Sequence, residues 1–174
     1  MAFPPSIPYS LRSCSFQCHK VVIKREPGLD YHVRPMVIGD FDQVVELWRS
    51  TEGIGMSDSD SPEAIADFLS RNPNLSLTAR LESGRLVGAV LCGHDGRRGY
   101  LYHLAVTRDF RHQGIAKALL DRCLAGLRAL GIQKCSIFVY ENNSDGQAFW
   151  THNGWKRRAD LCILQRPLGF PQAS

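Results

Sequence analysis

The sequence predicts an α+β domain built on a mixed sheet in which most neighbouring strands are antiparallel. Three consecutive strand-like segments are separated by short turn signals, a pattern typical of an antiparallel meander. A strand, a long segment of helical apolar periodicity and another strand follow, and this order favours a parallel crossover. The chain has 174 residues and 44% apolar content, which is enough for one hydrophobic core in one domain.

The first predicted elements are one strand and two helices. Residues 31–36, YHVRPM, alternate as a strand does. Apolar residues then recur at helical spacing after Asp40, which can cap that helix. A second helix has Ser61 at its N-cap and Pro62 at its first position. The polar, glycine-containing sequence 52–61 joins the two helices.

The meander and the crossover form the second half of the predicted domain. The meander strands are 75–81, 85–93 and 99–106, with Ser-Gly and Asp-Gly turns between them. A helix follows with Ile115, Leu119, Cys123, Leu127 and Leu130 on one face, and it ends near Gly131. We then expect a strand at 135–140, a short helix at 145–153 and a last strand at 155–164.

Residues 1–30 differ in character from the remainder. Pro4, Pro5 and Pro8 interrupt any amphipathic helix, and no acidic residue precedes Glu26. We therefore expect an irregular or disordered extension at 1–30, followed by one domain over 31–170.

Composition excludes several classes of protein. Lysine and arginine number 21 against 17 acidic residues, an excess too small to indicate nucleic-acid binding. No run of apolar residues is long enough to span a membrane. Six dispersed cysteines fit neither a disulfide scaffold nor a metal site, so we expect free thiols and a cytoplasmic location.

The segment 111–116, RHQGIA, lies where a predicted strand passes into a predicted helix. The first N–H groups of a helix lack intrahelical partners and carry the positive end of its dipole. Small residues at Gly114 and Ala116 let an anion approach those groups. The segment is therefore a candidate phosphate site, although its glycine could instead serve close packing alone.

Two segments in this order resemble the GNAT superfamily of acetyl-CoA-dependent N-acetyltransferases. The first is 104–120, LAVTRDFRHQGIAKALL, and the second is 143–155, NSDGQAFWTHNGW. The resemblance covers about Tyr31 to Pro167 and implies a sheet that splays open between its two parallel central strands, with helices on both faces as in an α/β sandwich. It also implies direct acetyl transfer to a primary amine of a small molecule or of a peptide or protein N-terminus.

The resemblance assigns residues to acetyl-CoA, the expected cosubstrate, with no metal. Pantetheine would pair with the main chain of one strand end and with an asparagine, and the pyrophosphate would bind the loop. The cofactor-binding residues implied are Leu104, Ala105, Val106, Arg111, His112, Gln113, Gly114, Ile115, Ala116, Asn143 and Trp150.

The reaction needs a proton acceptor, because an alkyl amine is neutral in only about one molecule in two thousand at neutral pH. His103 and Tyr102 are the candidate catalytic residues. Histidine has an unperturbed pKa of about 6.5, which suits a general base. Strand alternation lets only one of these neighbours face the cleft unless a bulge intervenes. Release of the proton through water remains a further alternative.

Trp150 stands where many family members have a tyrosine that protonates the leaving thiolate. An indole N–H is not a readily transferable proton, so Trp150 is expected to wall the channel or to hold the sulfur. This departure keeps open a second function, a non-catalytic acyl-CoA-binding or regulatory module.

The acceptor site is the least defined by sequence. Glu52, Asp58, Asp60 and Glu63 lie in or beside the loop between the first two helices. Such a cluster could attract a cationic amine or peptide, or it could be a solvated loop. The sequence leaves both monomer and homodimer open.

Overall fold

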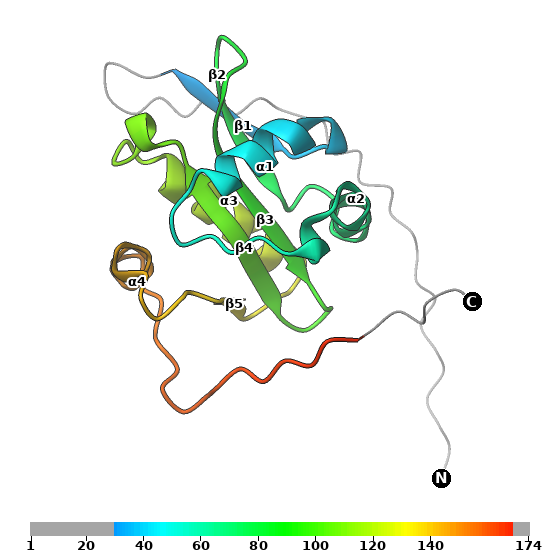
Figure 1. The fold of residues 1–174 in the computed structure, drawn as a ribbon, viewed down its shortest axis with the longest axis vertical. Helices are drawn as coiled ribbons and strands as arrows, with labels where there is room; N and C mark the ends of the chain where they lie inside the picture. Colours follow the sequence, from blue (N-terminus) through cyan, green and yellow to red (C-terminus); the bar gives the residue numbers. More distant parts are fainter. Residues whose placement is uncertain (1–29, 169–174) are drawn as a thin grey trace, which may run out of the picture.

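The computed structural model describes residues 30–168, which form a five-stranded sheet with helices on both faces (Figure 1). The strands are β1 (Tyr31–Pro35), β2 (Leu77–Leu81), β3 (Leu86–His94), β4 (Gly99–Val106) and β5 (Cys135–Ile137). The helices are α1 (Phe41–Arg49), α2 (Pro62–Arg71), α3 (Ile115–Ala129) and α4 (Ser144–His152). Short 3-10 turns are η1 (Ile38–Asp40), η2 (Asp58–Asp60) and η3 (Arg108–Phe110).

The sheet follows the chain in the order β1-β2-β3-β4-β5, and only the β4–β5 pair is parallel. The predicted mixed, mostly antiparallel sheet is therefore confirmed. The meander forms because the turns at 82–85 and 95–98 reverse the chain, and each contains a glycine at positive φ. Helix α3 supplies the crossover that makes β5 parallel to β4.

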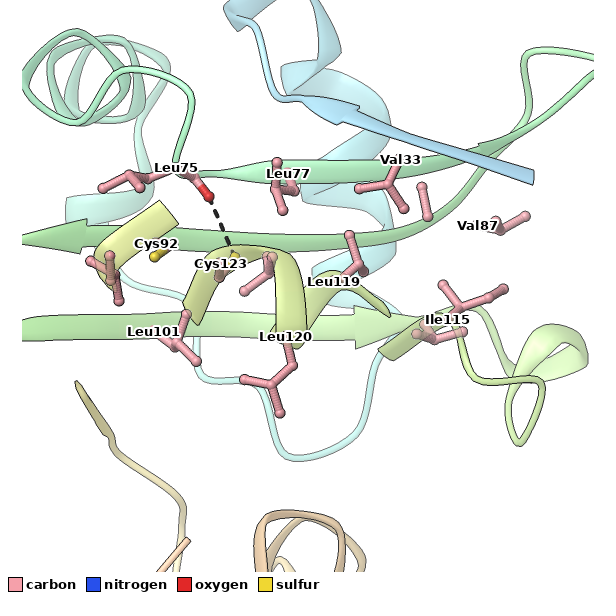
Figure 2. Packing of buried hydrophobic residues seen from close by; sticks show 14 of the residues in the cluster. Val33, Leu75, Leu77, Val87, Cys92, Leu101, Ile115, Leu119, Leu120 and Cys123 are labelled. Carbon is pink, nitrogen blue, oxygen red and sulfur yellow. Dashed lines mark hydrogen bonds between the residues drawn. The ribbon is translucent and has the colours of Figure 1, made fainter. Parts of the chain in front are cut away.

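The sheet divides two hydrophobic cores, one on each face. Helix α3 packs Ile115, Leu119 and Cys123 against one face, as its spacing predicts (Figure 2). Leu127 of the same helix belongs to this core as well. The expected fifth member, Leu130, is 55% exposed because the helix ends one residue before it. Helices α1 and α2 cover the other face with Val44, Trp48, Ile65 and neighbouring apolar side chains.

Buried cysteines belong to the core on the α3 side. The Cys123 thiol donates to the Leu75 carbonyl oxygen at 3.4 Å (Figure 2). A hydrogen bond with Cys92 and burial raise the pKa of Cys123, and burial raises the pKa of Cys135 to about 12. These thiols therefore stay protonated and act as packing groups. Among the described cysteines, Cys92, Cys123, Cys135 and Cys162 are all free.

Helix starts follow the predicted chemistry at α2 but not at α1. The Ser61 hydroxyl accepts the Ala64 N–H at 3.2 Å, and Pro62 opens the helix. Asp40 does not cap α1 with its side chain. Its carboxylate instead accepts hydrogen bonds from Arg34, Arg80 and the Val37 N–H, which ties η1 to β1 and β2.

The strand predicted over 155–164 is wrong. A turn interrupts it, because Arg158 donates to the Asp160 carboxylate and the Leu161 N–H bonds back to Arg158. The segment runs without strand pairing and leaves Leu161 62% exposed. The strand predicted over 135–140 is also shorter than expected, because pairing with β4 stops after Ile137.

No helix within residues 30–168 is long and apolar enough to cross a lipid bilayer. The extension predicted over 1–30 lies outside the described residues apart from its last position.

Candidate active site

A cleft of about 1400 Å³ opens where β4 and β5 part. The two strands pair from Gly99 with Cys135 to Leu101 with Ile137, and the pairing ends there. The remainder of β4, Tyr102–Val106, lines the cleft, and the 138–146 segment lines its other side. The edge of β4 that faces β5 is therefore unpaired beyond Leu101.

A β-bulge in β4 decides which side chains face this cleft. Tyr102 pairs with Leu91 of β3, but the next pair is Ala105 with Ala89, so two β4 residues lie opposite one of β3. His103 takes a left-handed φ of 52°, which is uncommon for a non-glycine residue. The bulge breaks the alternation, and both Tyr102 and His103 line the cleft.

His103 is held on two sides by side chains from the α1–α2 region. Its Nε2 lies 2.8 Å from Oδ1 of Asp60, whose side chain is only 9% exposed. The Trp48 ring, at 4.8 Å between centroids, packs against the imidazole. The imidazole itself is 16% exposed, so it is oriented by the fold and still reaches the cleft.

Tyr102 sits in an aromatic group with Phe68 at its edge and Tyr100 stacked beside it. Burial raises the pKa of Tyr102, and Tyr100 and Cys135 raise it further. The phenol therefore remains protonated at neutral pH. It can donate a hydrogen bond, but it is poorly suited to accept a proton.

The segment 111–116 has the backbone shape of an anion-binding turn. His112 and Gly114 have φ of 61° and 79°, and Gly114 is the N-cap of α3. A β-carbon at Gly114 would meet nothing within 4 Å, so the glycine serves its backbone conformation and not close packing. Gly114, Ile115 and Ala116, at the start of α3, line the cleft, and the first N–H groups of a helix have no intrahelical partners.

Two side chains of this turn donate hydrogen bonds to backbone carbonyl oxygens nearby. The Arg111 Nε donates to the Val106 carbonyl oxygen at 3.3 Å and lines the cleft. The Gln113 amide donates to the Asp109 carbonyl oxygen and is exposed. Other predicted cofactor residues on the cleft wall are Leu104, Ala105, Val106, His112, Gly114, Ile115 and Ala116.

Asn143 has a structural task besides the predicted one. Its side-chain oxygen accepts the Gly146 N–H at 2.8 Å and so caps α4, which leaves the amide NH2 as its donor group. The α1–α2 loop packs closely against this amide. A β-carbon at Gly53 would lie only 2.2 Å from the Nδ2 atom of Asn143. The same loop meets the Tyr140 hydroxyl at Gly55. Gly53 and Gly55 therefore let the loop bridge the two sides of the cleft.

Trp150 is a wall of the cleft. It is 9% exposed, belongs to the core on the α3 side and makes edge contacts with Phe149 and Trp155. These contacts place its ring in a packed aromatic cluster that lines the site.

The acidic loop divides into two parts. Glu52 and Asp60 line the cleft, whereas Asp58 and Glu63 are exposed and are not part of its lining within the described chain. The sequence pattern included Asp60 in the cluster but carried no signal for its contact with His103, 43 positions away. Trp48 is one of the apolar residues that recur at helical spacing after Asp40, and that pattern carries no signal for its contact with His103. Within residues 30–168, no three His, Cys, Asp or Glu side chains gather as a metal site.

Comparisons with known proteins agree with this architecture. The family model described as "Acetyltransferase (GNAT) family" matches residues 41–155. Acetyltransferase YE1169 of Yersinia enterocolitica is 38% identical over 64% of this chain and 77% of its own length. Acetyltransferase ECA0875 of Pectobacterium atrosepticum is 38% identical over 60% and 72%.

Solved structures share the fold. The PaiA N-acetyltransferase of Thermoplasma acidophilum in complex with coenzyme A aligns with a TM-score of 0.64 at 23% identity, over 72% of this chain and 89% of that one. Ard1 of Thermoplasma volcanium aligns with a TM-score of 0.66 at 18% identity, over 74% and 84%. The chain therefore belongs to the acetyltransferase (GNAT) family, with acetyl-CoA as its cosubstrate.

Proposed function

We propose that this protein transfers the acetyl group of acetyl-CoA to a primary amine, either of a small molecule or of a peptide or protein N-terminus, and that His103 accepts the amine proton. The main support for this proposal is the β-bulge in β4. It turns His103 into the cleft at the point where β4 leaves β5, and Asp60 holds the imidazole there.

The cofactor would lie along β4 and the start of α3. The pyrophosphate would bind the N–H groups of 111–116, with Arg111 adding positive charge. The pantetheine arm would pair with the main chain of Leu104, Ala105 and Val106, which lies beyond the last β4–β5 pair. The Asn143 amide would donate to the arm from the other side, and Trp150 would wall the channel.

His103 suits the proton step better than Tyr102. The amine must lose a proton before its nitrogen can attack the thioester carbonyl. The raised pKa of Tyr102 keeps that phenol protonated, so Tyr102 is better suited to donate a hydrogen bond than to remove a proton. Imidazole can accept and release protons near neutral pH.

The acceptor would enter past the α1–α2 loop, on the side opposite the cofactor loop. The α1–α2 loop contributes Glu52 and Asp60 to the cleft lining, and the start of α3 contributes Lys117 beside Arg111. Acidic groups on the loop and basic groups at the helix start favour a cationic amine near the loop and an anionic cosubstrate near the helix. The cysteines within residues 30–168 are free thiols, which supports the predicted cytoplasmic location of the protein.

Release of free thiol from acetyl-CoA, measured over a panel of amines, tests the proposed reaction. The panel would hold alkyl monoamines, diamines and peptides with free N-termini, and the matched control is each peptide with its N-terminus already acetylated. We expect turnover with at least one free amine and none with its blocked form. Tight acetyl-CoA binding without turnover on any amine would instead support a non-catalytic acyl-CoA-binding module.

A further inference from the structure

Asp60 uses its two carboxylate oxygens for two different partners. Oδ1 lies 2.8 Å from Nε2 of His103, and Oδ2 accepts the backbone N–H of Ser57 at 2.8 Å. The Ser57 N–H is a backbone group at the N-cap of η2 and can only donate. The side chain of Asp60 is therefore fixed at one oxygen by the loop and at the other by the imidazole.

This arrangement specifies where the imidazole carries its proton. An ionised carboxylate only accepts hydrogen bonds, so the Nε2 that faces Asp60 must be the nitrogen that bears hydrogen. In a neutral imidazole the other nitrogen then has the free lone pair. Trp48 packs on the ring and limits its rotation, so the two nitrogens cannot readily exchange places.

We infer that Asp60 is a positioning residue that fixes His103 in the Nε2–H form and leaves Nδ1 as the atom that accepts the substrate proton. The inference rests on the proposed function for its chemical role. Nδ1 takes one proton from the acceptor ammonium, and the neutral amine nitrogen then forms its bond to the acetyl carbon. The carbon–sulfur bond breaks, the remaining surplus proton of that nitrogen passes to the thiolate, and His103 returns its proton to solvent.

Asp60→Asn tests this assignment because an amide has only one accepting oxygen. If that oxygen faces the fixed Ser57 N–H, the amide NH2 faces Nε2 and donates to it. Nε2 must then be the unprotonated nitrogen, and the hydrogen moves to Nδ1. The opposite orientation sets the NH2 against the Ser57 N–H, two donors facing each other. The variant is therefore expected to invert the tautomer of His103.

Nitrogen-15 NMR of the histidine imidazoles reads the tautomer directly, without any activity assay. The His103 signals are identified by their loss in His103→Gln. We expect a protonated Nε2 and an unprotonated Nδ1 in the wild type at a pH where the ring is neutral, and the reverse in Asp60→Asn. Asp58→Asn is the matched control, because it removes the same charge from an exposed position of the same turn and should leave the wild-type pattern.

Kinetics then separate this inference from the proposed function. If His103 is the base, Asp60→Asn should lower kcat by a factor of about 10² to 10⁴ and change the KM for acetyl-CoA by less than about threefold. Asp58→Asn should retain the wild-type kcat. Loss of turnover in His103→Gln together with full turnover in Asp60→Asn would overturn the positioning role and leave the proposed base intact.

The opposite pattern also has a definite meaning. An inverted tautomer in Asp60→Asn would support the tautomer assignment. Full turnover in His103→Gln, found together with it, would show that His103 is not the base and that Nδ1 does not accept the substrate proton. A wild-type spectrum with the hydrogen on Nδ1 would overturn the inference outright. That last result needs no variant, so the inference stays testable even if Asp60→Asn does not fold.

Discussion

Substitution of Gly114 should separate the backbone requirement of the cofactor loop from its role in binding phosphate. Gly114 has φ of 79° and open space around its missing β-carbon. Gly131, just past the other end of α3, has φ of 77° and equally open space. Alanine at either position therefore faces the same penalty, about 1–2 kcal/mol for a left-handed conformation. For a domain of this size we expect Tm to fall by about 3–8 °C in both variants.

A glutamate at position 114 adds a negative charge at the start of α3. The carboxylate can itself occupy the helix N-terminus, where it would compete with the pyrophosphate. Loss of two charge-assisted hydrogen bonds, at about 1.5–3 kcal/mol each, corresponds to roughly 10²–10⁴ in affinity for acetyl-CoA. Gly131→Glu adds the same group at the far end of α3 and should leave that affinity within about twofold.

Isothermal titration calorimetry with acetyl-CoA measures the affinities, and thermal unfolding without ligand checks that each variant is folded. A folded Gly114→Glu protein that binds acetyl-CoA as tightly as the wild type would refute the assignment of 111–116 to the pyrophosphate. An equal loss of affinity in Gly131→Glu would show that the effect arises from helix damage.

Three further predictions concern the remainder of the chain. Deletion of residues 1–30 should leave acetyl-CoA affinity unchanged in calorimetry, since every candidate cofactor residue lies beyond it, and a large loss would show that the extension contributes to cofactor binding. Trp150→Ala should destabilise the fold by about 3 kcal/mol or more in urea unfolding, because Trp150 is packed in the core, and an unchanged midpoint would contradict this. Burial raises the pKa of Asp40, but hydrogen bonds from Arg34, the Val37 N–H and Arg80 outweigh it and hold that pKa below its ordinary value. Asp40→Asn should therefore lower the free energy of unfolding by about 3 kcal/mol at neutral pH. The difference from wild type should shrink below about pH 4, because the unfolded carboxylate binds a proton before the native one does, and a difference independent of pH would refute the argument.

Local signals in the sequence were sufficient for most of the fold. Ser61 and Pro62 define the start of α2, and the repeat from Ile115 to Leu127 defines the buried face of α3. The glycine turns of the meander likewise specify antiparallel neighbours. Each of these features depends on residues a few positions apart, so the sequence displays it directly.

The site depends on features that no local pattern displays. At the bulge, His103 adopts a left-handed backbone conformation. Glycine and asparagine are the residues that usually indicate such a conformation, so the sequence does not reveal it here. The pairing of His103 with Asp60 joins residues that only the folded chain brings together. The last predicted strand fails for a related reason, because the local Arg158–Asp160 pair closes a turn inside an otherwise strand-like segment.

The proposed reaction depends on His103 to remove the proton of the acceptor amine. The pH dependence of kcat for thiol release, measured at saturating acetyl-CoA and amine, tests it most directly in wild type, His103→Gln and Tyr102→Phe. If His103 is the base, the wild-type rate rises with pH through one ionisation, and His103→Gln loses this rise together with a factor of about 10² to 10⁴ in kcat. Full turnover with the same rise in His103→Gln would contradict the claim, and loss of that rise in Tyr102→Phe alone would transfer the role to Tyr102.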